Sequence, residues 1–323
     1  LGLMEFLPAY RLWVLVMVLV MVGSMAAVAV ELRMRAATVG PVVVAVLLSS
    51  PMIGTLGLGQ IYPLLTAGLV AAWLADRRGR LVFVGLALGL VVALKPSLAP
   101  VLLVPALRRR WLTVGAALLA GTGATVLGWI VCGPDSAPTW AQLLLTNPPV
   151  TYWDNASLPG AILRLTSVND WGRPLVELPG GMVIGLLIGG VLLVSTAWAA
   201  RRPPADGLDT ALWAMAAAAL LASPLSWHNY LLVLMPGVVV LIACGRWPVA
   251  ALLLALSLIG MEWPPIWYGD DNTVPALPVS LYCAILLTYW FALLPRPRPC
   301  LGRPNNRLNS GNASAPAPET AIA

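Results

Sequence analysis

The sequence predicts an all-α protein that crosses a membrane many times. Of its 323 residues, 59% are hydrophobic and only 10% are charged, whereas soluble domains carry about 25% charged residues. A soluble chain of this length could not hide so much apolar surface, because its exterior needs polar cover. The apolar runs also lack the sustained alternation of a transmembrane β-barrel. We therefore expect one transmembrane domain over residues 1–294.

Eleven apolar runs follow one another along this domain. A helix needs about 20 residues to cross the hydrocarbon core, so several of the runs are too short to cross unaided. We expect broken or re-entrant helices at 39–50 and 98–107, and such irregular backbone is tolerated only beside protein or a water-filled cavity. The sequence thus predicts a polar cavity inside the domain. The runs cover residues 12–30, 39–50, 61–75, 81–94, 98–107, 112–131, 181–200, 210–222, 229–244, 248–263 and 277–294.

The basic residues predict the orientation of these runs. Fifteen of the 19 lie in alternate loops and in the tail, and an excess of Lys and Arg marks the cytoplasmic side. This alternation requires all eleven runs to cross. Topology therefore explains the net charge of +6 better than nucleic-acid binding does. The cytoplasmic set is Arg33, Arg35, Arg77, Arg78, Arg80, Arg108, Arg109, Arg110, Arg201, Arg202, Arg246, Arg296, Arg298, Arg303 and Arg307; the other set is Arg11, Lys95, Arg164 and Arg173.

Two stretches lie outside the expected spans. Residues 132–180 are rich in Pro, Asn, Asp and Trp, and loops longer than about 12–15 residues are usually functional or disordered. Their aromatic residues favour a folded segment on the outer face. Residues 295–323 are rich in Pro, Asn, Ser and Ala, which predicts a disordered cytoplasmic tail.

The start of the chain conflicts with this topology. The alternation places Leu1 on the outer face, yet the first residues lack the basic region and cleavage site of a signal peptide. We therefore expect upstream sequence with at least one more helix. A start codon assigned too late would give the same appearance.

Two polar residues near the ends of apolar runs are candidates for chemistry, because polar groups at membrane depth are costly. Lys95 lies where two short runs meet, and Pro96 breaks the helix there. It either binds a phosphate as a point charge or extends to the lipid headgroups. His228, the single histidine, follows Ser226-Trp227. It either binds an anion or moves a proton, or is an interfacial residue beside a helix cap.

Two further segments offer hydrogen-bonding groups. Gln60 follows a glycine-rich turn and carries both donor and acceptor. The segment 152–160, with Arg164 after it, places Asp, Asn and Ser beside aromatic rings, as in a carbohydrate-binding surface or an ordinary turn-rich loop. Asp270-Asp271 could hold a divalent cation, although adjacent carboxylates are usually solvated. The scattered cysteines and single histidine show no metal spacing, so no metal or cofactor is indicated, and a divalent metal stays open.

In this order, these motifs resemble the bacterial polytopic glycosyltransferases of family 87, a branch of the GT-C class. The resemblance covers about residues 5–245, and Ala156 stands where the family often has Gln. It rests on Leu7-Pro8 before Trp13, Gly59-Gln60, Leu94-Lys95-Pro96 with Arg108-Arg109-Arg110-Trp111, Asn155-Ala156-Ser157-Leu158 with Gly160 and Arg164, and Ser223-Pro224-Leu225-Ser226-Trp227-His228.

The resemblance implies an inverting hexosyltransferase, an α-mannosyltransferase, in the bacterial plasma membrane with its active site facing outside. The donor would be a polyprenyl-phosphate sugar and the acceptor a glycolipid or glycan. The class uses an acidic base in its first outer loop, which would lie upstream of Leu1, and Glu5 is too close to a span to replace it. The implied roles are donor-phosphate binding for Lys95 and Arg164, catalysis for His228, and substrate binding for Gln60, Tyr152, Asn155, Ser157 and Trp227.

Two other functions remain compatible with the sequence. A transporter or flippase for a lipid-linked sugar would also have broken helices, but it usually shows internal repeats, and none is convincing here. A non-catalytic assembly protein of the membrane would suit a chain without the acidic base. The acceptor, the linkage, the sugar and the oligomeric state are not readable from the sequence.

Overall fold

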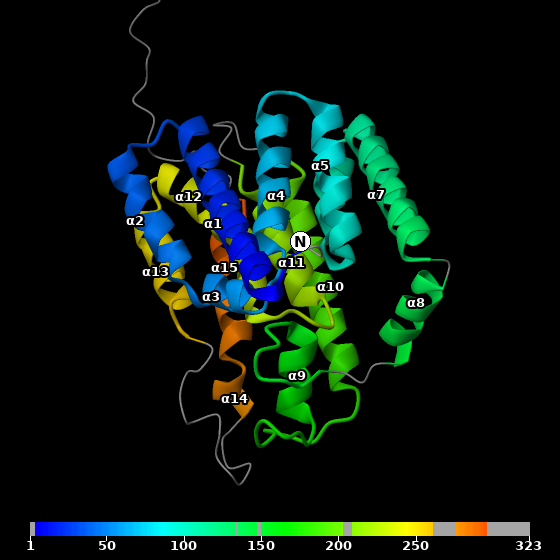
Figure 1. Cartoon of the computed structure of the whole chain (residues 1–323). Coiled ribbons are helices and arrows are strands. Elements are labelled where there is room, and N and C mark those ends of the chain that lie inside the picture. The colour runs from blue at the N-terminus through cyan, green and yellow to red at the C-terminus, as the bar shows by residue number, and fades with distance from the viewer. Residues whose placement is uncertain (1–3, 134, 147–149, 203–208, 261–275, 296–323) are drawn as a thin grey trace, which may run out of the picture.

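The computed structural model describes residues 4–133, 135–146, 150–202, 209–260 and 276–295. Within these ranges the chain is all-α, as the sequence predicts, and its one extended pairing is an isolated bridge between Asn155 and Trp227 (Figure 1). The helices are α1 (Phe6–Glu31), α2 (Ala36–Leu47), α3 (Ser50–Gly57), α4 (Tyr62–Arg77), α5 (Leu81–Leu94), η1 (Pro96–Leu102), α6 (Leu103–Leu107), α7 (Trp111–Cys132), α8 (Ser136–Thr146), α9 (Leu158–Thr166), α10 (Gly181–Ala200), α11 (Ala211–Ala222), η2 (His228–Leu234), α12 (Met235–Ala243), α13 (Trp247–Ser257), α14 (Ala276–Val279) and α15 (Leu281–Leu293).

All eleven predicted runs carry helix, but only some helices are long. Of the described helices, α1, α7 and α10 are long and apolar enough to cross a membrane, and the pair α2–α3 is a fourth candidate if it forms one span. The eleven crossings that the charge alternation requires therefore stay a prediction.

The predicted breaks are present, and a third one was not foreseen. α2 and α3 meet at an angle of 51°, where Ser49 caps α3. The run 98–107 is split into a 3-10 segment, η1, and the short helix α6. The run 229–244 is divided in the same way between η2 and α12. Both 3-10 segments directly follow a polar motif, at Lys95 and at Trp227.

The packing separates a buried centre from a lipid-like exterior. Ten of the twelve residues of α11 are buried, as expected for a helix that is hydrophobic all round. α7 lies at the edge of the bundle (Figure 1) and buries only Thr113 and Ala117, so its apolar side chains are largely exposed. Exposed apolar helices of this kind suit contact with lipid.

Glycines allow the closest approach between helices. A Cβ at Gly85 would overlap the carbonyl oxygen of Thr113, and one at Gly89 would overlap that of Ala117. The spacing of four residues places both glycines on one face of α5, where small residues let two backbones pack directly. α7 is therefore held against α5 without large side chains between them.

Those arginines of the predicted cytoplasmic set that bind described groups gather at one end of the bundle. Arg77 and Arg78, at the end of α4, bind Glu31 at the end of α1. Arg110 pairs with Asp76, and Arg108 binds Asp209 as well as the Ala200 carbonyl at the end of α10. Arg246 donates to the Ala292 carbonyl near the end of α15. In Figure 1 the α4–α5 loop lies at the top, whereas α9 lies at the opposite, lower end.

Candidate functional site

Three segments that are distant in the sequence meet around Lys95, at the end opposite the arginines. Lys95 ends α5, and its Nζ lies 3.6 Å from the ring centroid of Tyr230 and 5.9 Å from that of Tyr62. The two tyrosine rings are 4.6 Å apart. Aromatic faces attract a cation at these distances, so the amine is held over the rings. Within the described ranges, Lys95 forms no ion pair with a carboxylate.

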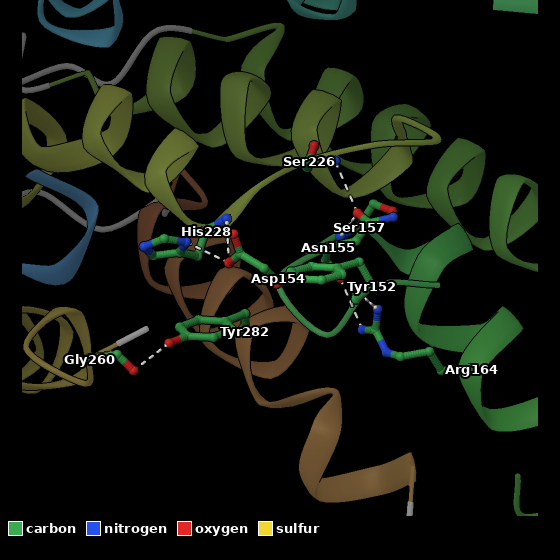
Figure 2. Close-up of polar contacts among 9 residues, drawn as sticks. All are labelled: Tyr152, Asp154, Asn155, Ser157, Arg164, Ser226, His228, Gly260 and Tyr282. Carbon is green, nitrogen blue, oxygen red and sulfur yellow. Dashed lines mark hydrogen bonds and ion pairs between the residues drawn. The ribbon is translucent and has the colours of Figure 1, made fainter. Parts of the chain in front are cut away.

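His228 begins η2 and is fully buried beside Asp154. Its Nδ1 lies 2.5 Å from Asp154 Oδ1, and its backbone N–H donates to the same oxygen at 3.3 Å (Figure 2). The imidazole lies 5.1 Å from the ring of Tyr282. Among the described residues, Nε2 and the Oδ1 of the neighbouring Asn229 have no hydrogen-bond partner, and Nδ1 meets Asp154 as a close ion-pair contact without the alignment of a hydrogen bond. Such buried polar atoms are costly to leave unpaired, which marks this place as a candidate ligand site.

Asn155 holds the 152–157 loop against the segment before His228. Its Nδ2 donates to the carbonyls of Val150 (2.9 Å) and Pro224 (3.2 Å). Its Oδ1 accepts from the backbone N–H groups of Ser157 (3.2 Å) and Ser226 (3.0 Å). Since an amide side chain has two donors and one oxygen acceptor, Asn155 is fully used by backbone groups. Asn155 therefore joins the 152–157 loop to the segment before His228.

Ser157 starts α9 in the way that its sequence predicts. Its hydroxyl accepts from the Gly160 N–H at 3.1 Å and donates to the Pro224 carbonyl at 3.3 Å. A serine N-cap followed by proline in the first turn is typical of helix starts. Ser157 thus fastens α9 to the same carbonyl as Asn155.

Arg164, from α9, is fully buried under this loop. It donates from Nη1 to the Tyr152 carbonyl (2.7 Å), from Nη2 to the Asn155 carbonyl (2.9 Å) and from Nε to Ser280 Oγ (3.3 Å) (Figure 2). Burial lowers the pKa of Arg164 to about 10, and Cys283 and Asp154 oppose that shift, so the guanidinium stays charged at neutral pH. All three kinds of donor nitrogen face protein atoms.

The aromatic residues of the predicted site pack on one another. Tyr152 lies 4.4 Å from Trp171, 5.3 Å from Trp153 and 5.8 Å from Trp227, between ring centroids. Tyr152 and Trp227 are half-buried, so parts of both rings remain accessible.

Gln60 is also half-buried, and it lies two residues before Tyr62, whose ring contacts Tyr230. Its loop is fastened to α1, because Tyr10 Oη donates to the Leu56 carbonyl and Trp13 Nε1 donates to the Gly59 carbonyl. The predicted residues therefore gather at one end, with Gln60 at the entrance to α4.

Three residues of this site received no role of their own from the sequence reasoning. Asp154 belonged to a recognised segment, but nothing local distinguished it from the other carboxylates of that loop. Tyr230 and Tyr282 lie inside apolar runs, where an aromatic residue gives no signal of its own. Only contacts between segments single them out, as the Asp154–His228 pair does over 74 residues.

The described residues contain no group of three or more His, Cys, Asp or Glu side chains placed to hold a metal ion. Asp270-Asp271, considered for a divalent cation, lies outside the described residues, as does most of the 295–323 tail. The described part of the chain thus offers no candidate metal centre.

Comparisons with known proteins agree with the motif order. The profile of glycosyltransferase family 87 matches residues 1–224. A polyprenol-phosphate-mannose-dependent alpha-(1-2)-phosphatidylinositol mannoside mannosyltransferase of Mycobacterium tuberculosis is 32% identical over 189 residues, covering 56% of this chain and 42% of that protein. A protein of the same description from Mycolicibacterium smegmatis is 29% identical over 196 residues, with the same coverage. The chain thus spans less than half the length of these relatives, and no solved structure matches it.

Proposed function

The chain belongs to glycosyltransferase family 87, and we propose that it forms part of an inverting membrane mannosyltransferase. The donor is a polyprenyl-phosphate mannose, and the acceptor is a glycolipid. Both relatives carry this donor and a phosphatidylinositol mannoside in their descriptions, which supports the donor and the class of acceptor.

The observation that carries this proposal is the environment of Lys95. Its amine lies over the rings of Tyr230 and Tyr62 and, within the described ranges, has no carboxylate partner. A polyprenyl-phosphate leaving group develops negative charge as the glycosidic bond breaks. A cation fixed beside that charge stabilises the transition state, and Lys95 is placed to supply it.

We propose different tasks for the other predicted residues. Gln60, Tyr152 and Trp227 keep accessible surface and are proposed to contact sugar or acceptor. Asn155, Ser157 and Arg164 were predicted as direct ligands, but their polar atoms bind other protein atoms, mostly of the backbone. We propose that these three hold the loop, while His228 contacts the donor.

The proposed orientation places this end of the bundle on the outer face of the bacterial plasma membrane. It follows from the arginines at the opposite end and the positive-inside rule. The test is labelling with a membrane-impermeant maleimide in a cysteine-free background. Asp170→Cys is expected to react from outside, and Arg80→Cys only after the membrane is permeabilised. The reverse pattern would overturn the orientation.

A transfer assay on the full-length gene product tests the activity. Reconstituted in vesicles with radiolabelled polyprenyl-phosphate mannose and a phosphatidylinositol mannoside, the protein is expected to form a larger glycolipid. GDP-mannose, as a matched donor without the lipid, is expected to be inert. Comparing the anomeric configuration of donor and product tests inversion. Movement of the donor across the bilayer without any product would instead indicate a transporter.

A further inference from the structure

We propose that Asp154 is a positioning residue for His228, which it holds so that Nε2 faces a phosphate oxygen of the donor. This inference rests on the proposed function. It concerns a carboxylate that the sequence did not single out, and it assigns His228 a defined orientation.

The contacts of Asp154 fix the histidine at two atoms. The same carboxylate oxygen lies 2.5 Å from Nδ1 of His228 and accepts from its backbone N–H at 3.3 Å. The side chains are only 7% and 1% exposed. A buried carboxylate is costly unless a partner offsets its charge, so this contact determines the positions of both residues.

The carboxylate itself is held by its neighbours along the chain. The carbonyls of Tyr152 and Asn155, on either side of it, are both bound by Arg164. The Asn155 amide ties the same loop to the segment before His228. These bonds fix the backbone that carries Asp154, and its carboxylate is held by the contacts with the His228 ring and backbone N–H. The guanidinium also adds positive charge near the buried carboxylate.

The imidazole is restrained on another side by Tyr282. The two rings lie 5.1 Å apart, and the tyrosine hydroxyl is fixed by the Gly260 carbonyl at 2.7 Å. Figure 2 shows the imidazole beside Asp154, with this tyrosine below them. With Nδ1 turned to the carboxylate, only Nε2 is left for a ligand, and it has no partner among the described residues.

This arrangement suits an anionic ligand oxygen. A carboxylate at Nδ1 stabilises the proton on that nitrogen and the positive charge of an imidazole that also carries a proton on Nε2. The Nε2–H group then donates a charge-assisted hydrogen bond to a phosphate oxygen, and this role moves no proton. Lys95 meets the same segment at Tyr230, two residues after His228, so we expect its amine and the Nε2–H group to contact the same phosphate.

The single histidine of the chain makes the pairing directly observable. With ¹⁵N-histidine labelling and no histidine tag, one imidazole contributes to the spectrum. The parent is expected to show a low-field Nδ1–H proton, and Asp154→Asn is expected to lose or shift it upfield. The exposed Asp170→Asn, in the same segment, is the matched control and should leave the signal unchanged. A parent-like signal in Asp154→Asn overturns the proposal.

Kinetics separate positioning from a structural role. Asp154→Asn is expected to lower kcat for transfer roughly 100-fold, the scale for losing one fixed stabilising donor, with little change in the donor KM, and Asp154→Glu should recover part of it. If Asp154→Asn does not fold, Asp154→Glu decides: its longer side chain must shift the Nδ1–H signal, and an unshifted signal overturns the proposal. An inactive parent whose signal responds as expected overturns the proposed function alone. An active parent whose signal does not respond overturns the role of Asp154 alone.

Discussion

The two ends of the bundle use charge in opposite ways. At the arginine-rich end, Arg77 and Arg78 share Glu31 at the surface, with side chains 23%, 55% and 19% exposed. At the other end, Asp154 and His228 pair almost without exposure, and Lys95 is held over aromatic rings. Charges are more numerous at the first end, but the Glu31 cluster there is partly exposed, whereas the Asp154–His228 pair is buried and Lys95 lies against aromatic rings. The environment of the charges, more than their number, marks the candidate site.

The largest effect is expected at Lys95. Lys95→Ala should reduce transfer about 10²–10³-fold, the range for losing one fixed stabilising group in a transition state, with little change in thermal unfolding. Lys95→Arg keeps the charge and should retain part of the activity. The exposed Arg35→Ala, at the opposite end, is the control and should transfer normally. Activity of Lys95→Ala equal to that of the parent would remove the central observation of the proposed function.

Arg164 is expected to matter most for stability. Arg164→Ala leaves the carbonyls of Tyr152 and Asn155 buried without their donors, which costs about 1–3 kcal/mol for each group. Arg164→Lys should rescue little, because an ammonium cannot replace the planar fork. The exposed Arg173→Ala should unfold like the parent. Thermal unfolding in detergent measures all three variants. A parent-like midpoint for Arg164→Ala would contradict the role of Arg164 in holding the 152–157 loop.

The α5–α7 contact lies outside both charged ends, and its variants measure how much close helix packing contributes to the free energy of unfolding. Gly89→Ala should cost about 1–3 kcal/mol as the helices separate, because the new methyl would overlap the Ala117 carbonyl. Gly115→Ala, in α7, meets no atom within 4 Å and should stabilise the helix by up to about 1 kcal/mol. Unfolding measurements that ranked the two variants in the reverse order would contradict this interface.

The smallest effect is expected at the arginine-rich end. Glu31→Gln removes the shared carboxylate of Arg77 and Arg78 and should cost less than about 1 kcal/mol, as exposed ion pairs usually do. The loss should shrink further at high salt, because the pair is screened. Thermal unfolding of Glu31→Gln and of Asp154→Asn, each at low and at high salt, compares how much stability the two carboxylates contribute. Equal losses for the two carboxylate variants would erase the difference between the ends.

Much of the fold was predictable because its signals are local. Each predicted apolar run carries helix, whereas α8, α9 and all of α3 except Ser50 lie outside the predicted runs. Pro96 marked the break after Lys95, since proline lacks the N–H that would continue the helix. The break inside 229–244 was missed, although Pro236 lies there, because no polar residue after Asn229 and Tyr230 interrupts the hydropathy of the run. Helix length was also hard to judge, and only three described helices are long enough to cross alone.

The residues of the candidate site also divide into those that a local signal identifies and those that it does not. The sequence identified Lys95 and His228 from the cost of polar groups beside apolar runs, and it identified the 152–164 segment from its composition. It predicted that Asn155, Ser157 and Arg164 bind ligands, whereas in the structure they bind protein atoms. A polar side chain looks the same in a sequence whether its partner is a sugar or a buried carbonyl.

By itself, the sequence determined the all-α class, the membrane environment, the single arginine-rich side and the family, because hydropathy, charge and motif order are properties of neighbouring residues. Only the tertiary structure decided that Asp154 meets His228, that Tyr230 lies under Lys95, and that Arg164 holds a loop. These contacts join residues whose partnership depends on how distant helices pack. Packing energy is shared over the whole bundle and leaves no local pattern in the chain.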